Sequence, residues 1–305
     1  MRLNYPRLWT FYNVAQTKNC TVAARRIHLT QPAVSTHLSH LARELGVKLF
    51  ERKDKQMELT DDGAALFRYA ESIFNLSEKA LEEIATRKTA NAVRIDLAAG
   101  LLFVEHYLPT LLGAFQKQYP GVQLRIHTGP TRPLIEKMIS YECQFAFLGH
   151  VPGDANLVAK RILEDRIVVI VGARHALSRR QSISLQELSD WPIVSFAKGS
   201  ETRTVFEDVL QREGISLMPI METFSSEGIK RAVEAGIGIA PFLLRPAERE
   251  LREKTLVALP IEGRSIMRVH NFVYRRDYPM SPVARHFKTF VLDAIRKGWT
   301  SKSSL

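Results

Sequence analysis

Apolar positions recur at helical spacing through the first ninety residues, and this pattern changes to alternation beyond residue 92. Leu8, Phe11 and Val14 predict a first amphipathic helix. A second helix is predicted to begin at a Thr21 cap. The small side chains of Ala23 and Ala24 follow, where two helices would cross closely. The opening segment is therefore expected to be a small helical domain.

A third helix is predicted between a Thr30 cap, with Pro32 in its first turn, and a stop at Gly46. One face is apolar, with Val34, Leu38, Leu41 and Leu45. The remaining positions are polar: Gln31, Ser35, Thr36, His37, Ser39 and His40. A short helix, a tight turn and a helix with a polar face are typical of a helix-turn-helix, here at about residues 20–39.

The second helix of this motif lies in the major groove with its first residues near base edges. Gln pairs with adenine, and Ser or Thr with several bases. We therefore expect DNA contacts from Gln31, Pro32, Ser35, Thr36, His37 and Ser39. The alternative is that Ser35 bonds only within its own helix and that the histidines are simply exposed.

Residues 49–60 predict two short strands around a basic turn, which is the pattern of a wing. Arg52 and Lys53 lie in it, placed for phosphates or the minor groove. Charge agrees with this interpretation, because residues 1–60 hold ten Lys and Arg but four Asp and Glu, giving +6 of the net +11. Such a basic segment suits a polyphosphate partner, although a basic solvated face would give the same count.

A long helix is predicted from about residue 61 to residue 88, followed by a polar hinge at residues 86–92. Its apolar positions alternate in spacing between three and four: Leu66, Tyr69, Ile73, Leu76 and Ala80. That alternation is typical of a two-stranded coil and favours dimerisation. The alternative is a single amphipathic helix packed on the body of the protein.

Residues 92–305 alternate between predicted strands and helices, which indicates an α/β domain with a parallel sheet. The first strand runs from Val93 to Ala99, and the apolar run at residues 167–171 is typical of a buried parallel strand. Other strands are predicted at residues 122–126, 145–148, 194–196, 217–221, 237–242 and 269–274. The helices between them are expected near residues 108–119, 133–141 and 282–297.

The first sixty residues resemble the LysR-type transcriptional regulators. The resemblance is carried, at the family's spacing, by Phe11, Ala23 with Ala24, the run from Thr30 to Ser35, Leu41, Leu45 with Gly46, the run from Leu49 to Arg52, Leu59 with Thr60, and Gly63. Two departures are Ala42, where the family usually has Glu, and Thr36 with His37, where an Arg-Gln type pair is more common. The first affects helix packing or an ion pair, and the second changes which bases are recognised.

The remaining chain resembles the LysR effector module, which has the fold of periplasmic binding proteins. The matching residues include Leu108 with Pro109, Phe115, the run from Tyr119 to Val122, Gly129, Ile229 and the run from Val233 to Pro241. The resemblance implies two α/β subdomains joined by two crossovers, at about residues 92–162 with 268–305 and at about residues 163–267. It also implies a dimer or tetramer on promoter DNA, in which an effector closes the cleft and alters DNA bending.

Ligands of open α/β sheets bind beyond the carboxyl ends of the strands. We expect effector contacts there from Gly100, Leu101, Leu102, Thr128, Gly129, Pro130, Phe147, Gly149, Ser195, Phe196, Phe224 and Ser225. Hydroxyls beside helix N-termini favour anions, and the phenylalanines supply an apolar wall, so the expected effector is a small carboxylate with an apolar or aromatic body, such as an aromatic acid. The alternative is that the hydroxyls are only helix caps, and the first strand turn lacks the hydroxyl that many relatives carry.

The sequence also excludes classes of function. It lacks a Gly-x-Ser-x-Gly elbow, a phosphate-binding loop and a His-Glu-x-x-His motif, so an enzyme is the weaker hypothesis. Cys20 and Cys143 match no metal spacing, and we expect no cofactor and no metal. Neither a membrane span nor a secretion signal is predicted, so a cytoplasmic regulator is expected. An effector-independent architectural DNA-binding protein is the remaining alternative.

Overall fold

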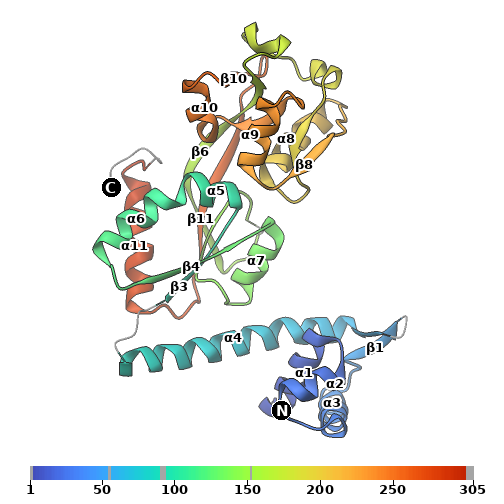
Figure 1. Ribbon diagram of the computed structural model, residues 1–305. Coiled ribbons are helices and arrows are strands. Elements are labelled where there is room, and N and C mark those ends of the chain that lie inside the picture. Colours follow the sequence, from blue (N-terminus) through green and yellow to red (C-terminus); the bar gives the residue numbers. More distant parts are fainter. Residues whose placement is uncertain (1–2, 54–55, 90–93, 152, 300–305) are drawn as a thin grey trace. The chain divides into compact units, whose positions relative to one another are not determined.

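The computed structural model describes residues 3–53, 56–89, 94–151 and 153–299. The chain forms two compact units, Met1–Thr89 with Ile139–Glu142, and Ala90–Met138 with Cys143–Leu305 (Figure 1). Parts of three predicted features lie outside the described residues: Val93 at the start of the first strand, residues 54–55 of the wing turn, and residues 90–92 of the hinge.

The first unit contains three short helices, a two-stranded wing and one long helix. The helices are α1 (Tyr5–Thr17), α2 (Cys20–Arg26), α3 (Gln31–Leu45) and α4 (Asp61–Thr89), and the antiparallel wing strands are β1 (Phe50–Lys53) and β2 (Gln56–Leu59). Leu8 and Phe11 of α1 pack with Leu41 of α3 and Phe74 of α4 in one core. This is the predicted winged helix-turn-helix followed by a long helix.

Helix caps explain where α2 and α3 begin. Asn19 caps α2, because its side-chain oxygen accepts hydrogen bonds from Thr21 N (2.9 Å) and Val22 N (3.1 Å). The predicted Thr21 cap is therefore wrong: an Asn two residues earlier already satisfies the free N–H groups. Thr30 caps α3 as predicted, and Gly46 ends it with a φ of 71° in the left-handed region.

The second unit begins with an α/β arrangement. Its elements are β3 (Arg94–Ala99), α5 (Leu101–His106), α6 (Leu108–Gln118), β4 (Gln123–Thr128), α7 (Thr131–Ile139) and β5 (Phe145–Leu148). Strand β3 lies between β4 and β5 and is parallel to both. The C-terminal helix α11 (Pro282–Arg296) contributes Phe287, which contacts Phe115 and Phe145 in the core.

Two long strands, β6 (Leu157–Gly172) and β11 (Ile266–Arg275), pair with each other and continue into the rest of this unit (Figure 1). There β6 also pairs with β9 (Ala240–Leu243) and β10 (Leu256–Leu259). The other elements are β7 (Val194–Phe196), α8 (Glu201–Arg212), β8 (Met221–Thr223), α9 (Ser226–Glu234) and α10 (Glu248–Arg252), with short 3-10 helices at Ala176–Arg179, Gln186–Asp190 and Arg245–Ala247. The two subdomains, residues 92–162 with 268–305 and residues 163–267, stay a prediction.

The sheet corrects the predicted strand directions and bounds. Residues 167–171 are buried as expected, but β6 is antiparallel to β9, β10 and β11, so the predicted parallel direction is wrong. Burial on both faces produces a continuous apolar run in either direction. The strands predicted at residues 217–221 and 237–242 begin later, at Met221 and Ala240. Within the described part of the chain, no helix has the length and apolar character needed to cross a membrane.

Candidate DNA-binding surface and effector cleft

Helix α3 presents its polar side chains outward. Val34 and Leu41 are buried and fix the helix on the core of the first unit. The side chains on the other faces at its N-terminal half are exposed: Gln31, Pro32, Ser35, Thr36 and Ser39. These five are the predicted base-contacting residues other than His37, and the structure brings them together on one helix.

His37 is half-buried and contacts α1 instead of standing free. Its Nδ1 lies 2.8 Å from the Thr10 hydroxyl, which itself donates to the Pro6 carbonyl (3.0 Å). Because the single hydrogen of that hydroxyl is directed to Pro6, the hydroxyl accepts from His37 Nδ1–H. This contact holds the His37 ring against α1.

The wing strands β1 and β2 pair from Phe50 with Leu59 to Lys53 with Gln56. Phe50 contacts Phe11 of α1 with ring centroids 5.3 Å apart, which attaches the wing to the helices. Arg52 and Lys53 are on β1 as predicted, and their side chains lie outside the described part of the structure. Their predicted phosphate contacts stay a prediction.

Helix α4 has both a covered and an exposed apolar face. Leu66 and Phe74 pack toward the core of the first unit. Tyr69, Ile73 and Leu81 are exposed, with 71% of Tyr69 accessible. The predicted coil seam is therefore divided: Leu66 contributes to the core, whereas Tyr69 and Ile73 remain uncovered in the single chain.

A cavity of about 170 Å³ lies at the strand ends of the second unit. It brings together predicted effector residues that are far apart in sequence: Gly100, Leu101, Leu102, Thr128, Gly129, Pro130, Phe196 and Phe224. It is also lined by residues outside that predicted set: Thr131, Gly199, Ser200, Glu201 and Arg268.

The structure does not bring the other predicted effector residues to this cavity. Phe147 is buried, with its ring stacked on Phe103 at 4.9 Å between centroids. Ser195 lines a separate cavity of about 380 Å³ between α8 and β7. Ser225 caps α9 by accepting from Gly228 N (3.0 Å), which is the alternative role of a hydroxyl at a helix start. Gly149 donates its backbone N–H to Glu201 Oε2 (2.7 Å) and does not line the cavity.

Glu201 and Arg268 supply the charge of the cavity. Arg268 Nη2 donates to Glu201 Oε2 (2.9 Å), and its Nη1 donates to the Thr202 hydroxyl (2.8 Å). Arg268 comes from β11 and only 5% of it is exposed, whereas Glu201 is the first residue of α8. Neither residue is among those predicted from the sequence. One signal was available for Arg268. Side chains alternate between the two faces of a strand, and Arg268 lies at the same alternating positions of β11 as the buried Ile266 and Phe272.

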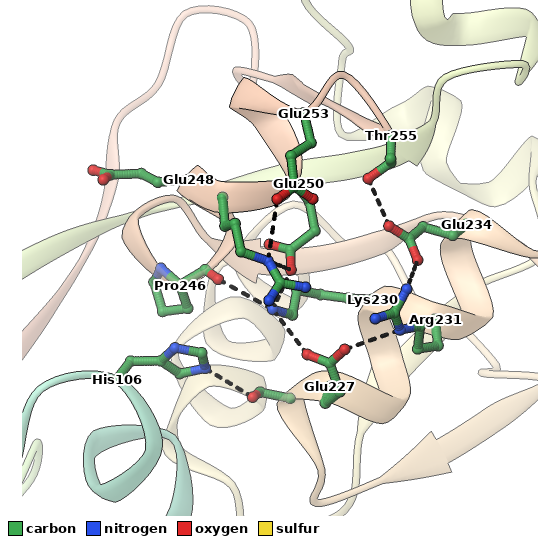
Figure 2. A network of polar contacts seen from close by, with 12 residues as sticks. His106, Glu227, Lys230, Arg231, Glu234, Pro246, Glu248, Glu250, Glu253 and Thr255 are labelled. Carbon is green, nitrogen blue, oxygen red and sulfur yellow. Dashed lines mark hydrogen bonds and ion pairs between the residues drawn. The ribbon is translucent and has the colours of Figure 1, made fainter. Parts of the chain in front are cut away.

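A second polar cluster lies beside α9 (Figure 2). Lys230, almost fully buried, pairs with Glu250 at 2.8 Å and with Glu227 at 3.0 Å. His106, the last residue of α5, lies 2.9 Å from the Ser226 hydroxyl, which itself donates to Glu105. Burial, followed by the charge of Lys230, lowers the pKa of His106 to about 4, so this histidine is neutral at neutral pH.

The long strands are held together by a further buried group. The Tyr107 hydroxyl donates to Asp165 of β6 at 2.5 Å, and burial raises the pKa of both side chains. His270 of β11 lies beside the Tyr107 ring, with centroids 5.3 Å apart. Burial lowers the pKa of His270 well below its usual value. Tyr107, which lies between α5 and α6, therefore contacts both long strands.

A winged helix-turn-helix joined by a long helix to a two-subdomain α/β domain with a cleft defines a class of one-component transcriptional regulator. The family model for the bacterial regulatory helix-turn-helix protein, lysR family, matches residues 6–64, and that for the LysR substrate binding domain matches residues 89–296. The chain belongs to the LysR family. It is a DNA-binding transcriptional regulator with an effector-binding domain, and family membership confirms the prediction of a regulator over an enzyme.

Named relatives and solved structures match two thirds or more of this chain. The RuBisCO operon transcriptional regulator of Allochromatium vinosum is 31% identical over 294 residues, covering 96% of each chain. Full-length CbnR complexed with its target DNA has a TM-score of 0.67 at 18% identity, over 97% of this chain and all of that one. The regulatory domain of CcmR from Synechocystis PCC6803, in complex with 2-PG, has a TM-score of 0.61 at 23% identity. The match covers 67% of this chain and 97% of that one.

Proposed function

We propose that α3 enters the major groove of promoter DNA and recognises base edges with Gln31, Ser35 and Thr36. The supporting observation is their exposure on a helix whose opposite face, at Val34 and Leu41, is fixed in the core. Pro32 and Ser39 complete the contact surface, and His37 adds a contact to a base edge. Arg52 and Lys53 of the wing bind phosphates and set the register of the helix on the duplex.

Self-association places two such helices on one site. Recognition helices of dimeric regulators bind half-sites about one DNA turn apart. The exposed apolar side chains of α4, including Tyr69, Ile73 and Leu81, form the surface that a second α4 covers. We propose a dimer built on this helix and assembled further into a tetramer, acting on DNA in the cytoplasm.

The effector is a small carboxylate with an apolar or aromatic body. Leu101, Leu102, Phe196 and Phe224 give the cavity apolar walls, and Arg268 supplies a cation. Thr128 and Ser200 add hydroxyls, and the Ser200 side chain makes no capping bond to α8. Apolar walls with a few convergent polar groups are the common composition of a small-molecule site.

The effector changes DNA binding through the arrangement of the two subdomains. The cavity is lined from both, by Gly100 and Thr128 on one side and by Phe196 and Ser200 on the other. A ligand that contacts both sides binds one arrangement better than the other, and only that differential affinity can shift the equilibrium. The two long strands β6 and β11 pass between the subdomains and bend with them.

The test is capture of genomic fragments by the purified full-length protein, followed by footprinting of the best fragment at near-physiological salt. The proposal predicts a protected, partly palindromic site beside a promoter, with two protected segments about one helical turn apart. Binding without any sequence preference would contradict the proposal and indicate an architectural DNA-binding protein.

A further inference from the structure

Glu201 makes contacts on both sides of the cleft. It begins α8 in one subdomain, while its carboxylate reaches the loop that follows β5 in the other. Its Oε2 accepts from Gly149 N at 2.7 Å, and its Oε1 accepts from His150 N at 2.9 Å. Arg268 Nη2 donates to the same carboxylate at 2.9 Å. Glu201 is therefore bound as a ligand carboxylate would be, by two adjacent amides and a guanidinium.

The three donors are held in place by other residues. Asn271 of β11 donates to the Gly149 carbonyl at 2.6 Å, which orients the peptide group on that side. The Thr202 hydroxyl accepts from Arg268 Nη1, and Arg268 is 5% exposed. Among the described residues, Arg268 Nε has no hydrogen-bond partner although it is buried. A fixed guanidinium with spare donor capacity beside two amides is a site built for a carboxylate.

We propose that Gly149 N, His150 N and Arg268 form the carboxylate subsite of the effector, and that Glu201 occupies this subsite until an effector displaces it. The proposal rests on the effector cleft proposed above and specifies how that cleft is controlled. An incoming carboxylate replaces the Glu201 carboxylate, which turns toward solvent at the mouth of the cavity.

The size of the cavity supports displacement. Ligand sites commonly have volumes of about 300–1,000 Å³, whereas this cavity measures about 170 Å³ with Glu201 and Arg268 in its wall. Gly149 and His150 do not line it, since the carboxylate lies against their amides. A Cβ added at Gly149 would lie 2.6 Å from Glu201 Oε2, which shows how closely the two residues pack. Removal of the Glu201 side chain therefore opens both the volume and the amides.

Exchange of one carboxylate for another also keeps the buried charge of Arg268 paired. Arg268 would be costly to leave buried without a negative partner, and the exchange gives it one throughout. The exchange releases the start of α8 from the loop after β5, which uncouples the two subdomains at this point. Occupancy of the subsite is thereby linked to the arrangement of the subdomains.

Chemical rescue tests the proposal without knowledge of the effector. In full-length Glu201→Ala, the subsite is empty and acetate can enter it as a substitute carboxylate. We expect the midpoint of thermal unfolding of this variant to rise by about 3 °C in acetate relative to chloride at equal ionic strength. The wild type, whose subsite is filled, should show no such difference.

Two further variants identify the site. Glu207→Ala, on the same helix but paired with Arg203, should respond to acetate like the wild type. Arg268→Met combined with Glu201→Ala should lose the acetate response. If Glu201→Ala does not yield folded protein, Glu201→Asp, whose carboxylate is shorter by one methylene, should still show a smaller acetate response.

An equal acetate effect on wild type, Glu201→Ala and the double variant would overturn the proposal. This outcome is distinct from failure of the proposed function, because footprinting of the wild type measures DNA recognition without reference to acetate. A wild type that protects a specific site, together with an acetate effect confined to Glu201→Ala, supports both.

Discussion

The recognition helix and the effector cleft hold their polar groups in different states. On α3, the side chains of Gln31, Ser35 and Thr36 are exposed to solvent. In the cleft, Arg268 and the carboxylate of Glu201 are already bound to each other, and Glu201 also binds two backbone amides. Contacts with DNA therefore replace only water on these side chains, whereas an effector must replace an existing contact within the protein. Affinity in the cleft is a difference between two sets of protein contacts, which makes the cleft suited to a switch.

The largest expected difference between the regions is in stability. Arg268→Met leaves Glu201 beside the amides without its cation, and loss of one partner of a buried pair costs about 3–5 kcal/mol. Gln31→Ala, at an exposed position near the start of α3, should change the unfolding free energy by less than about 0.5 kcal/mol. Urea unfolding of both variants measures the contrast, and similar losses of stability in the two would contradict the difference between the two regions.

An intermediate effect on stability is expected from pH, through His106 of the second unit. His106 has a folded-state pKa of about 4 against a usual 6.5, so the unfolded chain binds more protons between these values. Its contribution to stability is complete above about pH 6.5 and is lost as pH falls toward about 4. Because the His106 side chain is 24% exposed, we expect a loss of about 1 kcal/mol near pH 5.

His106→Gln should weaken this pH dependence without abolishing it, because the buried His270 shifts in the same direction. Urea unfolding at about pH 7.5 and about pH 5 provides the measurement. Identical loss of stability in wild type and His106→Gln would contradict the assignment.

The smallest effect is expected at the wing. If Arg52 neutralises one phosphate, Arg52→Gln should weaken binding to all DNA sequences alike and reduce the slope of log affinity against log salt by about one. Binding titrations at several salt concentrations, on specific and unrelated duplexes, measure this. A loss confined to the specific duplex would assign Arg52 to base recognition instead.

The two regions also differ in how far sequence could predict them. The recognition helix is specified locally: Thr30, Pro32 and Gly46 set its ends, and the spacing of Val34 and Leu41 sets its buried face. All of this information lies within about twenty residues. The error at the cap of α2 was also local, since Asn19 and Thr21 are both suitable cap residues and only geometry distinguishes them.

The cleft is assembled from distant segments, so no local pattern encodes its central contacts. Arg268 and Glu201 are 67 positions apart, and Gly149 is a further 52 from Glu201. The strand-end rule located eight of the lining residues, but it could not pair these three. Similarly, the apolar run of β6 indicated burial and not strand direction, because an apolar run is the same for parallel and antiparallel neighbours.

The central claim is that α3 recognises specific bases, and Gln31→Ala tests it most directly. The measurement is the affinity of wild type and variant for the footprinted site and for each single base-pair substitution of it. We predict that the variant loses about 1–3 kcal/mol of discrimination at one base pair and retains the others. Equal weakening on every sequence, with discrimination unchanged, would show that Gln31 does not recognise a base and would contradict the account of this surface.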